Sequence, residues 1–192
     1  KISLVNDAMK CGYENWKEEK FFDYIKKFGI EKDKKVKELS RGMKIKLMLS
    51  IALSHQANLL ILDEPTSGLD PSMRDELTDI LKEFVEDENN TVLFSTHITE
   101  DLDRIADYII FIDQGKIVEN SSKEDFLEKY LVLKGGEEDR ELLKDFDLLG
   151  IKSSDTSFEA LVKNIDIEKI PDELILENPD INKILVLYGR KK

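Results

Sequence analysis

The sequence predicts a mixed α/β fold built around a parallel sheet, on the basis of three observations. The run LLILD (59–63) is a short, uninterrupted apolar segment, typical of a strand buried on both faces, and TVLFST (91–96) reads as a second buried strand. A helical pattern of apolar residues lies between them, over 71–85. Because strand, helix and strand follow one another, the two strands are expected to pair in parallel.

The chain before the first strand reads as helical and charged. Over 6–37, large apolar residues recur near one helical face, and we interpret this stripe as core packing. Its members are Trp16, Phe21, Phe22, Ile25 and Phe28. Gly29 is expected to end the helix. A further helix is expected to begin at Ser40, which is a favoured N-cap residue.

Beyond the second strand, the pattern predicts a helix over 99–106, two strands over 108–120 around a turn at Gln114–Gly115, and a helix over 122–130. After Gly135–Gly136 the segments become shorter and mixed: a charged helical stretch, then SFEALVKNI, DELIL and a last segment. We interpret this last part as a small α+β appendage.

This reading divides the chain into three parts. Residues 1–57 form a helical subdomain, residues 58–130 the α/β core, and residues 131–192 the appendage. Inside the core, Asp70 and Pro71 suit the N-cap and the first position of the helix that joins the two strands.

The composition excludes several classes of protein. A chain of 192 residues is long enough for one sizeable core. The formal net charge of −12 argues against broad nucleic-acid binding, which requires a basic face. No apolar run is long enough to span a bilayer. The single cysteine, Cys11, excludes an internal disulfide framework and suits a reducing compartment.

Polar residues follow both predicted strands, at the point where each strand ends. Asp63 and Glu64 end the first strand, and Thr96 and His97 end the second. Ligands of an open parallel sheet bind beyond the carboxyl ends of its strands, so these side chains are expected at one rim. An aspartate there suits the magnesium of a nucleotide, and the glutamate suits a water-activating role. For the acid pair alone, capping of the turn before Pro65 is an equally good interpretation.

The acid pair does not occur alone. The segments LSRGMKIKLMLSIALSHQANLLILDEPTSGLD and VLFSTHITEDLDRIADYIIFIDQGKIVE closely resemble the ATP-binding cassette (ABC) ATPases of transporters, over roughly residues 37–130. LSRGM resembles the signature motif, LLILDE the Walker B motif, SGLD the D-loop, and His97 the switch histidine. The LSRGMK segment is similar to that of small bacterial exporter cassettes. The resemblance implies a P-loop NTPase-like core.

The resemblance also implies roles for individual residues. Asp63 would hold Mg²⁺ through its waters, Glu64 would be the general base or orient the attacking water, and His97 would contact the γ-phosphate of ATP. The signature residues Ser40, Arg41, Gly42 and Met43 would contact the ATP bound by a second subunit. The D-loop residues Ser67, Gly68, Leu69 and Asp70 would lie along the dimer interface.

Two positions depart from the family's usual signature, which has glycine at the position of Arg41 and glutamine at the position of Met43. An arginine adds a cation and disfavours positive φ, while methionine lacks the amide. Contact with phosphate is still expected, with a geometry that the resemblance does not fix.

A phosphate-binding loop of the form G-x-x-x-x-G-K-[ST] is absent from the sequence. The segment is expected to lie in an N-terminal part of the cassette that these residues do not include, through truncation or omission. Residues 1–192 alone are therefore expected to be inactive as an ATPase, and the complete protein active, as a translocase-class enzyme.

The expected partners follow from the resemblance as well. They are a membrane permease on a separate chain and a second cassette, identical or different, with no nucleic acid. The protein would then lie in the cytoplasm, peripheral on the inner face of the cell membrane. Two alternatives stay open: a non-transport ABC ATPase of translation or DNA repair, and an inactive regulatory fragment.

Overall fold

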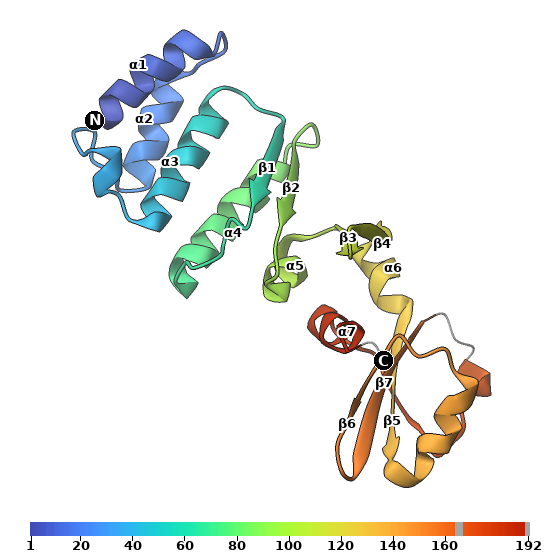
Figure 1. Ribbon diagram of the computed structural model, residues 1–192. Coiled ribbons are helices and arrows are strands. Elements are labelled where there is room, and N and C mark those ends of the chain that lie inside the picture. The colour runs from blue at the N-terminus through green and yellow to red at the C-terminus, as the bar shows by residue number, and fades with distance from the viewer. Residues whose placement is uncertain (164–166, 191–192) are drawn as a thin grey trace. The chain divides into compact units, whose positions relative to one another are not determined.

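The computed structural model describes residues 1–163 and 167–190, which belong to two units, Lys1–Asp101 and Leu102–Lys192 (Figure 1). Helices and strands alternate within them, so the predicted mixed α/β class is confirmed. Helix α5 (Thr99–Ile105) crosses the boundary between the units. The expected division at residues 57 and 130 stays a prediction.

Helices form the first part of the first unit. They are α1 (Ile2–Gly12), α2 (Glu18–Lys27), the 3-10 turn η1 (Val36–Glu38) and α3 (Arg41–Ser54). The structure divides the helical stretch that was expected to end at Gly29, because the chain turns between α1 and α2. The buried side chain of Asn6 holds this turn: its Oδ1 accepts a hydrogen bond from Trp16 Nε1 and its Nδ2 donates to Glu18 Oε1, both over 2.9 Å.

The apolar stripe packs as the sequence predicts. Phe21, Ile25 and Phe28 are buried, whereas Trp16 and Phe22 are half-buried. Gly29 follows α2 with a φ of 66°, in the left-handed region that glycine adopts readily. The stripe is therefore core packing, as interpreted from its spacing.

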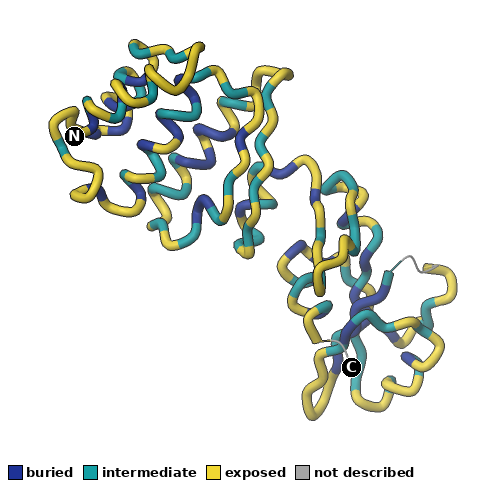
Figure 2. The backbone as a smooth tube through the Cα atoms, turned by 45° about the horizontal axis from the view of Figure 1, so that its top comes forward, coloured by how far each residue is buried: buried dark blue, intermediate teal, exposed yellow. Residues whose placement is uncertain are grey.

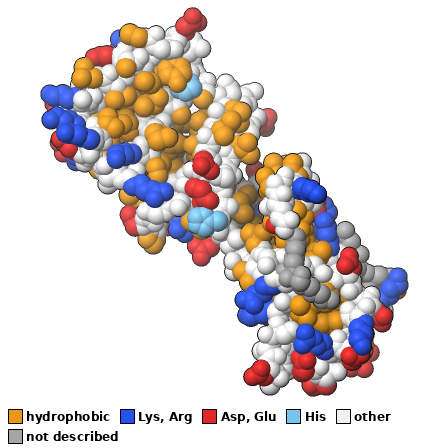
Figure 3. Space-filling model, in the orientation of Figure 1, with side chains coloured by type: hydrophobic (Ala, Val, Ile, Leu, Met, Phe, Trp, Pro, Cys, Tyr) orange, Lys and Arg blue, Asp and Glu red, His pale blue; other side chains and the backbone are white. Residues whose placement is uncertain are grey.

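The sheet of the first unit consists of β1 (Leu59–Asp63) and β2 (Thr91–Ser95), joined through α4 (Pro71–Val85). The strands run parallel, as predicted, with Leu59 opposite Thr91 and Asp63 opposite Ser95. Burial on both faces is not observed: Ile61 is 71% exposed, and Leu59 and Leu93 are also exposed. Figure 2 shows buried and exposed stretches along the backbone of the first unit, and Figure 3 shows hydrophobic side chains at its surface. One face of the pair is therefore uncovered among the described residues.

Both helices that flank β1 begin at the predicted caps. The Ser40 hydroxyl accepts a hydrogen bond from Met43 N (3.2 Å) at the start of α3. The Asp70 carboxylate accepts one from Met73 N (3.1 Å), with Pro71 at the first helical position of α4. These caps satisfy backbone N–H groups that the first helical turn leaves unpaired.

The second unit starts with a β-hairpin and ends in an antiparallel sheet. Strands β3 (Tyr108–Asp113) and β4 (Lys116–Ser122) form the hairpin around the predicted turn. The sheet has the order β6-β7-β5-β8. Its strands are β5 (Tyr130–Gly136), β6 (Gly150–Ser153), β7 (Ser157–Lys163) and β8 (Ile175–Glu177), and the helical elements of the unit are α6 (Lys123–Glu128), η2 (Glu137–Asp145), η3 (Ile167–Lys169) and α7 (Ile181–Tyr188).

This arrangement is an α+β unit, although its details differ from the expectation. The helix expected over 122–130 ends at Glu128, because Tyr130 begins β5, a strand that the sequence reading missed. The last two positions of the SFEALVKNI segment lie outside the described residues. Apolar residues pack on both faces of the sheet, with α7 among the elements of one core cluster and η2 among those of the other.

No helix within residues 1–163 and 167–190 combines the length and the apolar character needed to cross a membrane.

A charged group in the second unit gives a pH dependence that can be measured. Glu119 accepts hydrogen bonds from Lys129 Nζ (2.8 Å) and Lys163 Nζ (2.6 Å), and its side chain is only 11% exposed. These hydrogen bonds lower the pKa of Glu119 from 4.5 to about 2. Because the folded-state pKa is depressed, the stabilisation is present above pH 4.5 and is lost as the pH falls toward 2.

We expect Glu119→Gln to lower the free energy of unfolding at pH 7 by about 1.5–3 kcal/mol, as for hydrogen bonds to a charged group. The difference from the unsubstituted protein should shrink as the pH falls through the range below 4.5. Urea unfolding at a series of pH values measures both. Glu141→Gln is the matched control, since Glu141 pairs with Lys144 in an exposed position. A constant difference between the two curves at every pH would contradict the assignment.

Candidate functional site

Asp63 and Ser95 lie opposite each other at the carboxyl ends of β1 and β2. The Ser95 hydroxyl donates a hydrogen bond to Asp63 Oδ1 (2.5 Å) and accepts one from Glu64 N (3.0 Å). Ser95 therefore fixes the Asp63 carboxylate and the backbone of the next acid together. Ser95 was not among the predicted site residues, although the parallel register of the two strands would have placed it there.

Glu64 and His97 face each other at the same end of the sheet. Nδ1 of His97 lies 2.8 Å from one Glu64 oxygen and 2.7 Å from the other. The His97 side chain is 70% exposed and that of Glu64 is 35% exposed. A neutral imidazole in this position carries its proton on Nδ1 and donates it to the carboxylate, which leaves Nε2 as the second ring nitrogen for a ligand. The structure thus brings the two acids and the imidazole to one rim.

The turn after β1 holds Glu64 in an unusual backbone conformation. Its φ is 47°, in the left-handed region that residues other than glycine rarely adopt. The turn is fixed by hydrogen bonds from Ser67 N to Glu64 O (3.2 Å) and from Leu69 N to Thr66 O (3.1 Å). Such strain persists where surrounding contacts over-determine the backbone, and it is common at functional sites.

The residues expected to form the signature motif and the D-loop lie together within the first unit. A Cβ on the buried Gly42 would come within 2.1 Å of Met73 Cε, so the start of α3 approaches α4 closely. A Cβ on Gly68 would come within 2.9 Å of an Arg41 guanidinium nitrogen, so the Arg41 side chain lies against the turn. Arg41 therefore occupies space beside Gly68 instead of extending freely from the helix.

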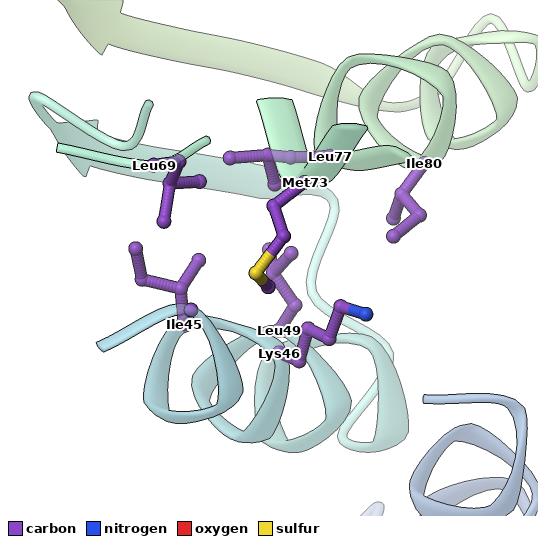
Figure 4. A pocket seen from close by; sticks show the side chains of 8 residues that line it. Ile45, Lys46, Leu49, Leu69, Met73, Leu77 and Ile80 are labelled. Carbon is purple, nitrogen blue, oxygen red and sulfur yellow. The ribbon is translucent and has the colours of Figure 1, made fainter. Parts of the chain in front are cut away.

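Leu69 closes the contact between α3 and α4 (Figure 4). It lines a cavity of about 10 Å³. The other lining residues are Gly42, Ile45, Lys46, Leu49, Met73, Leu77 and Ile80. A cavity of this size is at the lower limit for one water molecule, so it is a packing contact and not a ligand site.

The donor set at the rim fits a magnesium ion that keeps most of its waters. In residues 1–163 and 167–190, no group of three or more His, Cys, Asp or Glu side chains is arranged to hold a metal. Mg²⁺ is commonly bound through one or two carboxylates together with waters and substrate phosphates. Asp63, held by Ser95, provides one such carboxylate at the sheet end.

A further polar contact behind the rim was missed by the sequence analysis. Thr66 and Asp101 are both buried, and the Thr66 hydroxyl donates to Asp101 Oδ2 over 2.5 Å. A charged residue within a predicted helix over 99–106 gives no signal of burial in the sequence. Its side-chain partner, moreover, is 35 positions away.

A family model described as "AAA domain, putative AbiEii toxin, Type IV TA system" matches residues 5–103. The lantibiotic transport ATP-binding protein SrtF of Streptococcus pyogenes is 46% identical over 83 residues, which are 43% of this chain and 36% of SrtF. The bacitracin transport ATP-binding protein BcrA of Bacillus licheniformis is 38% identical over 89 residues, 46% of this chain and 29% of BcrA.

The linearmycin resistance ATP-binding protein LnrL of Bacillus subtilis extends the match furthest of these relatives. It is 31% identical over 156 residues, which cover 74% of this chain and 49% of LnrL. The chain therefore spans less than half of the length of each of these relatives.

Solved structures show the same fold. The ATP-binding subunit of an ABC transporter superposes with a TM-score of 0.59 at 23% identity, over 66% of this chain and 55% of that one. A dimeric bacterial ABC transporter cassette gives a TM-score of 0.53 at 20% identity, over 62% of this chain and 54% of the cassette. By its family model the chain belongs to the AAA-domain family, and the relatives that it matches are ATP-binding subunits of ABC transporters.

Proposed function

We propose that the complete protein carrying this sequence binds and hydrolyses ATP to energise a separate membrane permease. The observation that carries the proposal is the meeting of Asp63, Glu64 and His97 at one end of the parallel strand pair. Carboxylates and an imidazole in that position are suited to phosphoryl transfer, in which positioning and charge stabilisation supply most of the catalysis.

Each of the three side chains has a separate role in the proposed reaction. Glu64 accepts a proton from, or orients, the water that attacks the γ-phosphate. His97, held by Glu64 through Nδ1, directs Nε2 toward the phosphate; in its imidazolium form both ring nitrogens are donors, and Nε2–H stabilises the developing charge. Asp63 would hold Mg²⁺ through the ion's waters. When bound, that ion neutralises charge on the β- and γ-phosphates.

The start of α3 is proposed to contact ATP on a second cassette, identical or different. Ser40, Arg41, Gly42 and Met43 surround the N-terminus of this helix, where backbone N–H groups and the helix dipole favour an anion. The D-loop would then lie along the interface between the cassettes. Its residues are Ser67, Gly68, Leu69 and Asp70, and Arg41 and Leu69 link the two segments within one subunit.

The proposed assembly lies in the cytoplasm, on the inner face of the cell membrane, with the permease as its partner. The names of SrtF, BcrA and LnrL refer to lantibiotic transport, bacitracin transport and linearmycin resistance, which favours an exporter. Residues 1–192 contain no G-x-x-x-x-G-K-[ST] loop. Taken alone, they are therefore proposed to be inactive. The missing loop is the observation that favours a regulatory role.

Substitution of the α3 cap tests the proposed contact between cassettes. In the complete protein, Ser40→Arg should prevent ATP-driven dimerisation but leave ATP binding by the monomer intact, because the bulky cation fills the space for the other subunit's phosphate. Sedimentation and equilibrium binding with a fluorescent ATP analogue measure the two quantities. Ser154→Arg, in an exposed loop of the second unit, is the matched control. Loss of monomer binding in Ser40→Arg would show that Ser40 contacts the subunit's own nucleotide.

A further inference from the structure

The loops that carry Glu64 and His97 are joined by buried hydrogen bonds. Thr66 lies two positions after Glu64 and is 1% exposed. Its hydroxyl donates to Oδ2 of Asp101 over 2.5 Å. Asp101 lies in the first turn of α5 and is 0% exposed. The carboxylate therefore fastens the turn after β1 to the helix that follows the histidine.

The same oxygen also contacts the other loop. Thr96, directly before His97, places Oγ1 3.4 Å from Asp101 Oδ2, and this hydroxyl accepts a hydrogen bond from Ile98 N (2.9 Å). One carboxylate oxygen thus lies between hydroxyl groups that flank the two functional side chains. Movement of Asp101 would shift both loops.

The Thr66–Asp101 hydrogen bond carries a free-energy cost as well as a gain, because it buries a carboxylate. Oδ1 of Asp101 is buried and has no hydrogen-bond partner in the part of the chain that the structure describes. A buried carboxylate with an unsatisfied oxygen is unfavourable, and replacing such a pair by apolar side chains of similar shape is often neutral or stabilising. The buried Asp101 carboxylate is therefore better explained by a role in holding the two loops in place than by a role in stability.

We propose that Thr66 and Asp101 are positioning residues that hold Glu64 and His97 in contact. The structural part of this inference concerns the chain by itself, and its catalytic part rests on the proposed ATPase function. Without the Thr66–Asp101 bond the two loops separate, His97 loses its carboxylate partner, and the Nδ1 proton is no longer favoured.

The tautomer of His97 reports the contact without any nucleotide. The chain has only two histidines, so ¹⁵N-histidine labelling gives two imidazole signals. At about pH 9, where imidazoles are neutral, we expect His97 in the unsubstituted protein to be mainly the Nδ1–H tautomer. His55, which stacks on Tyr13 at 4.3 Å, is the internal reference and should not change.

Four variants separate positioning from folding. Thr66→Val should convert His97 to the Nε2–H tautomer that free histidine prefers, and Thr66→Ser should restore the original tautomer. The double variant Thr66→Val/Asp101→Leu removes the bond without leaving a buried charge unpaired, so it should fold and still show the Nε2–H form. Thr78→Val is the matched control, because Thr78 is 0% exposed and, within the described residues, its hydroxyl donates only to Arg74 O (2.9 Å).

Steady-state kinetics of the complete protein give the catalytic readout. Thr66→Val and the double variant should lower kcat by about 10- to 100-fold, the scale of a 1 Å misplacement, with KM changed less than about twofold. An unchanged His97 tautomer in the folded double variant would overturn the inference, as would an unchanged kcat when the tautomer shifts. If the complete protein lacks ATPase activity while the tautomer shifts as expected, the proposed function fails and the structural coupling stands.

Discussion

In the complete protein, Glu64→Gln should retain Mg²⁺–ATP binding while its turnover falls by about 10²–10⁴-fold, the usual effect of losing a general base. The amide keeps the size of the side chain and still accepts a hydrogen bond from His97, so the rim should keep its shape. It cannot take a proton from the attacking water. Bound ATP would then persist, and the lifetime of an ATP-bound dimer should increase.

Single-turnover hydrolysis and ATP binding, measured on the same preparation, separate the chemical step from affinity. Glu83→Gln is the matched control, because Glu83 pairs with Lys27 on an exposed surface at 3.1 Å and lies away from the rim. Normal turnover in Glu64→Gln would remove Glu64 from the reaction. Loss of ATP binding together with turnover would assign Glu64 to the binding of nucleotide instead.

The second large effect is expected in the packing of the second unit. Gly150, at the start of β6, lies against the end of α7: an added Cβ would come within 1.9 Å of Leu187 O and 2.8 Å of Leu187 C. Both are backbone atoms, so no side-chain rotation relieves the clash. Gly150→Ala must displace α7 from the sheet, at an expected cost of about 3 kcal/mol, as for overpacking of a core.

Hydrogen exchange of the α7 amides, over Ile181–Tyr188, measures this displacement directly. A cost of about 3 kcal/mol corresponds to exchange that is faster by about 100-fold. Trp16, the only tryptophan in the sequence, gives a fluorescence signal for the first unit in the same samples. Gly12→Ala is the control, because a Cβ there would meet nothing within 4 Å. Unchanged protection of α7 in Gly150→Ala would show that the helix does not pack as described.

Local patterns in the sequence were sufficient to predict the strand pair and the helix caps. The run before Asp63 is apolar and short, and Ser40 and Asp70 carry side-chain oxygens at the first turns of their helices. Each of these signals depends on neighbours within a few positions. The meeting of Glu64 and His97 could also be expected, since parallel strands bring their carboxyl ends together.

Contacts between distant positions were the ones that the sequence reading missed. Asn6 bridges to Trp16 and Glu18 and so divides a stretch that has helical periodicity throughout. The buried Asp101 is charged and stands in a helix, so nothing local distinguishes it from an exposed residue. Strand β5 (Tyr130–Gly136) was not predicted, because Tyr130 continues the helical pattern of the segment before it.

The left-handed backbone at Glu64 has a consequence for how this protein would change under selection. A glycine at position 64 would relieve the positive φ of 47° and abolish the carboxylate in one step. A library screened for thermal tolerance alone should therefore enrich glycine there, and a library screened for growth that depends on the working protein should eliminate it. The first screen would select for glycine at position 64 and the second against it. Sequencing the survivors of both screens would therefore measure the conflict between stability and activity at this residue.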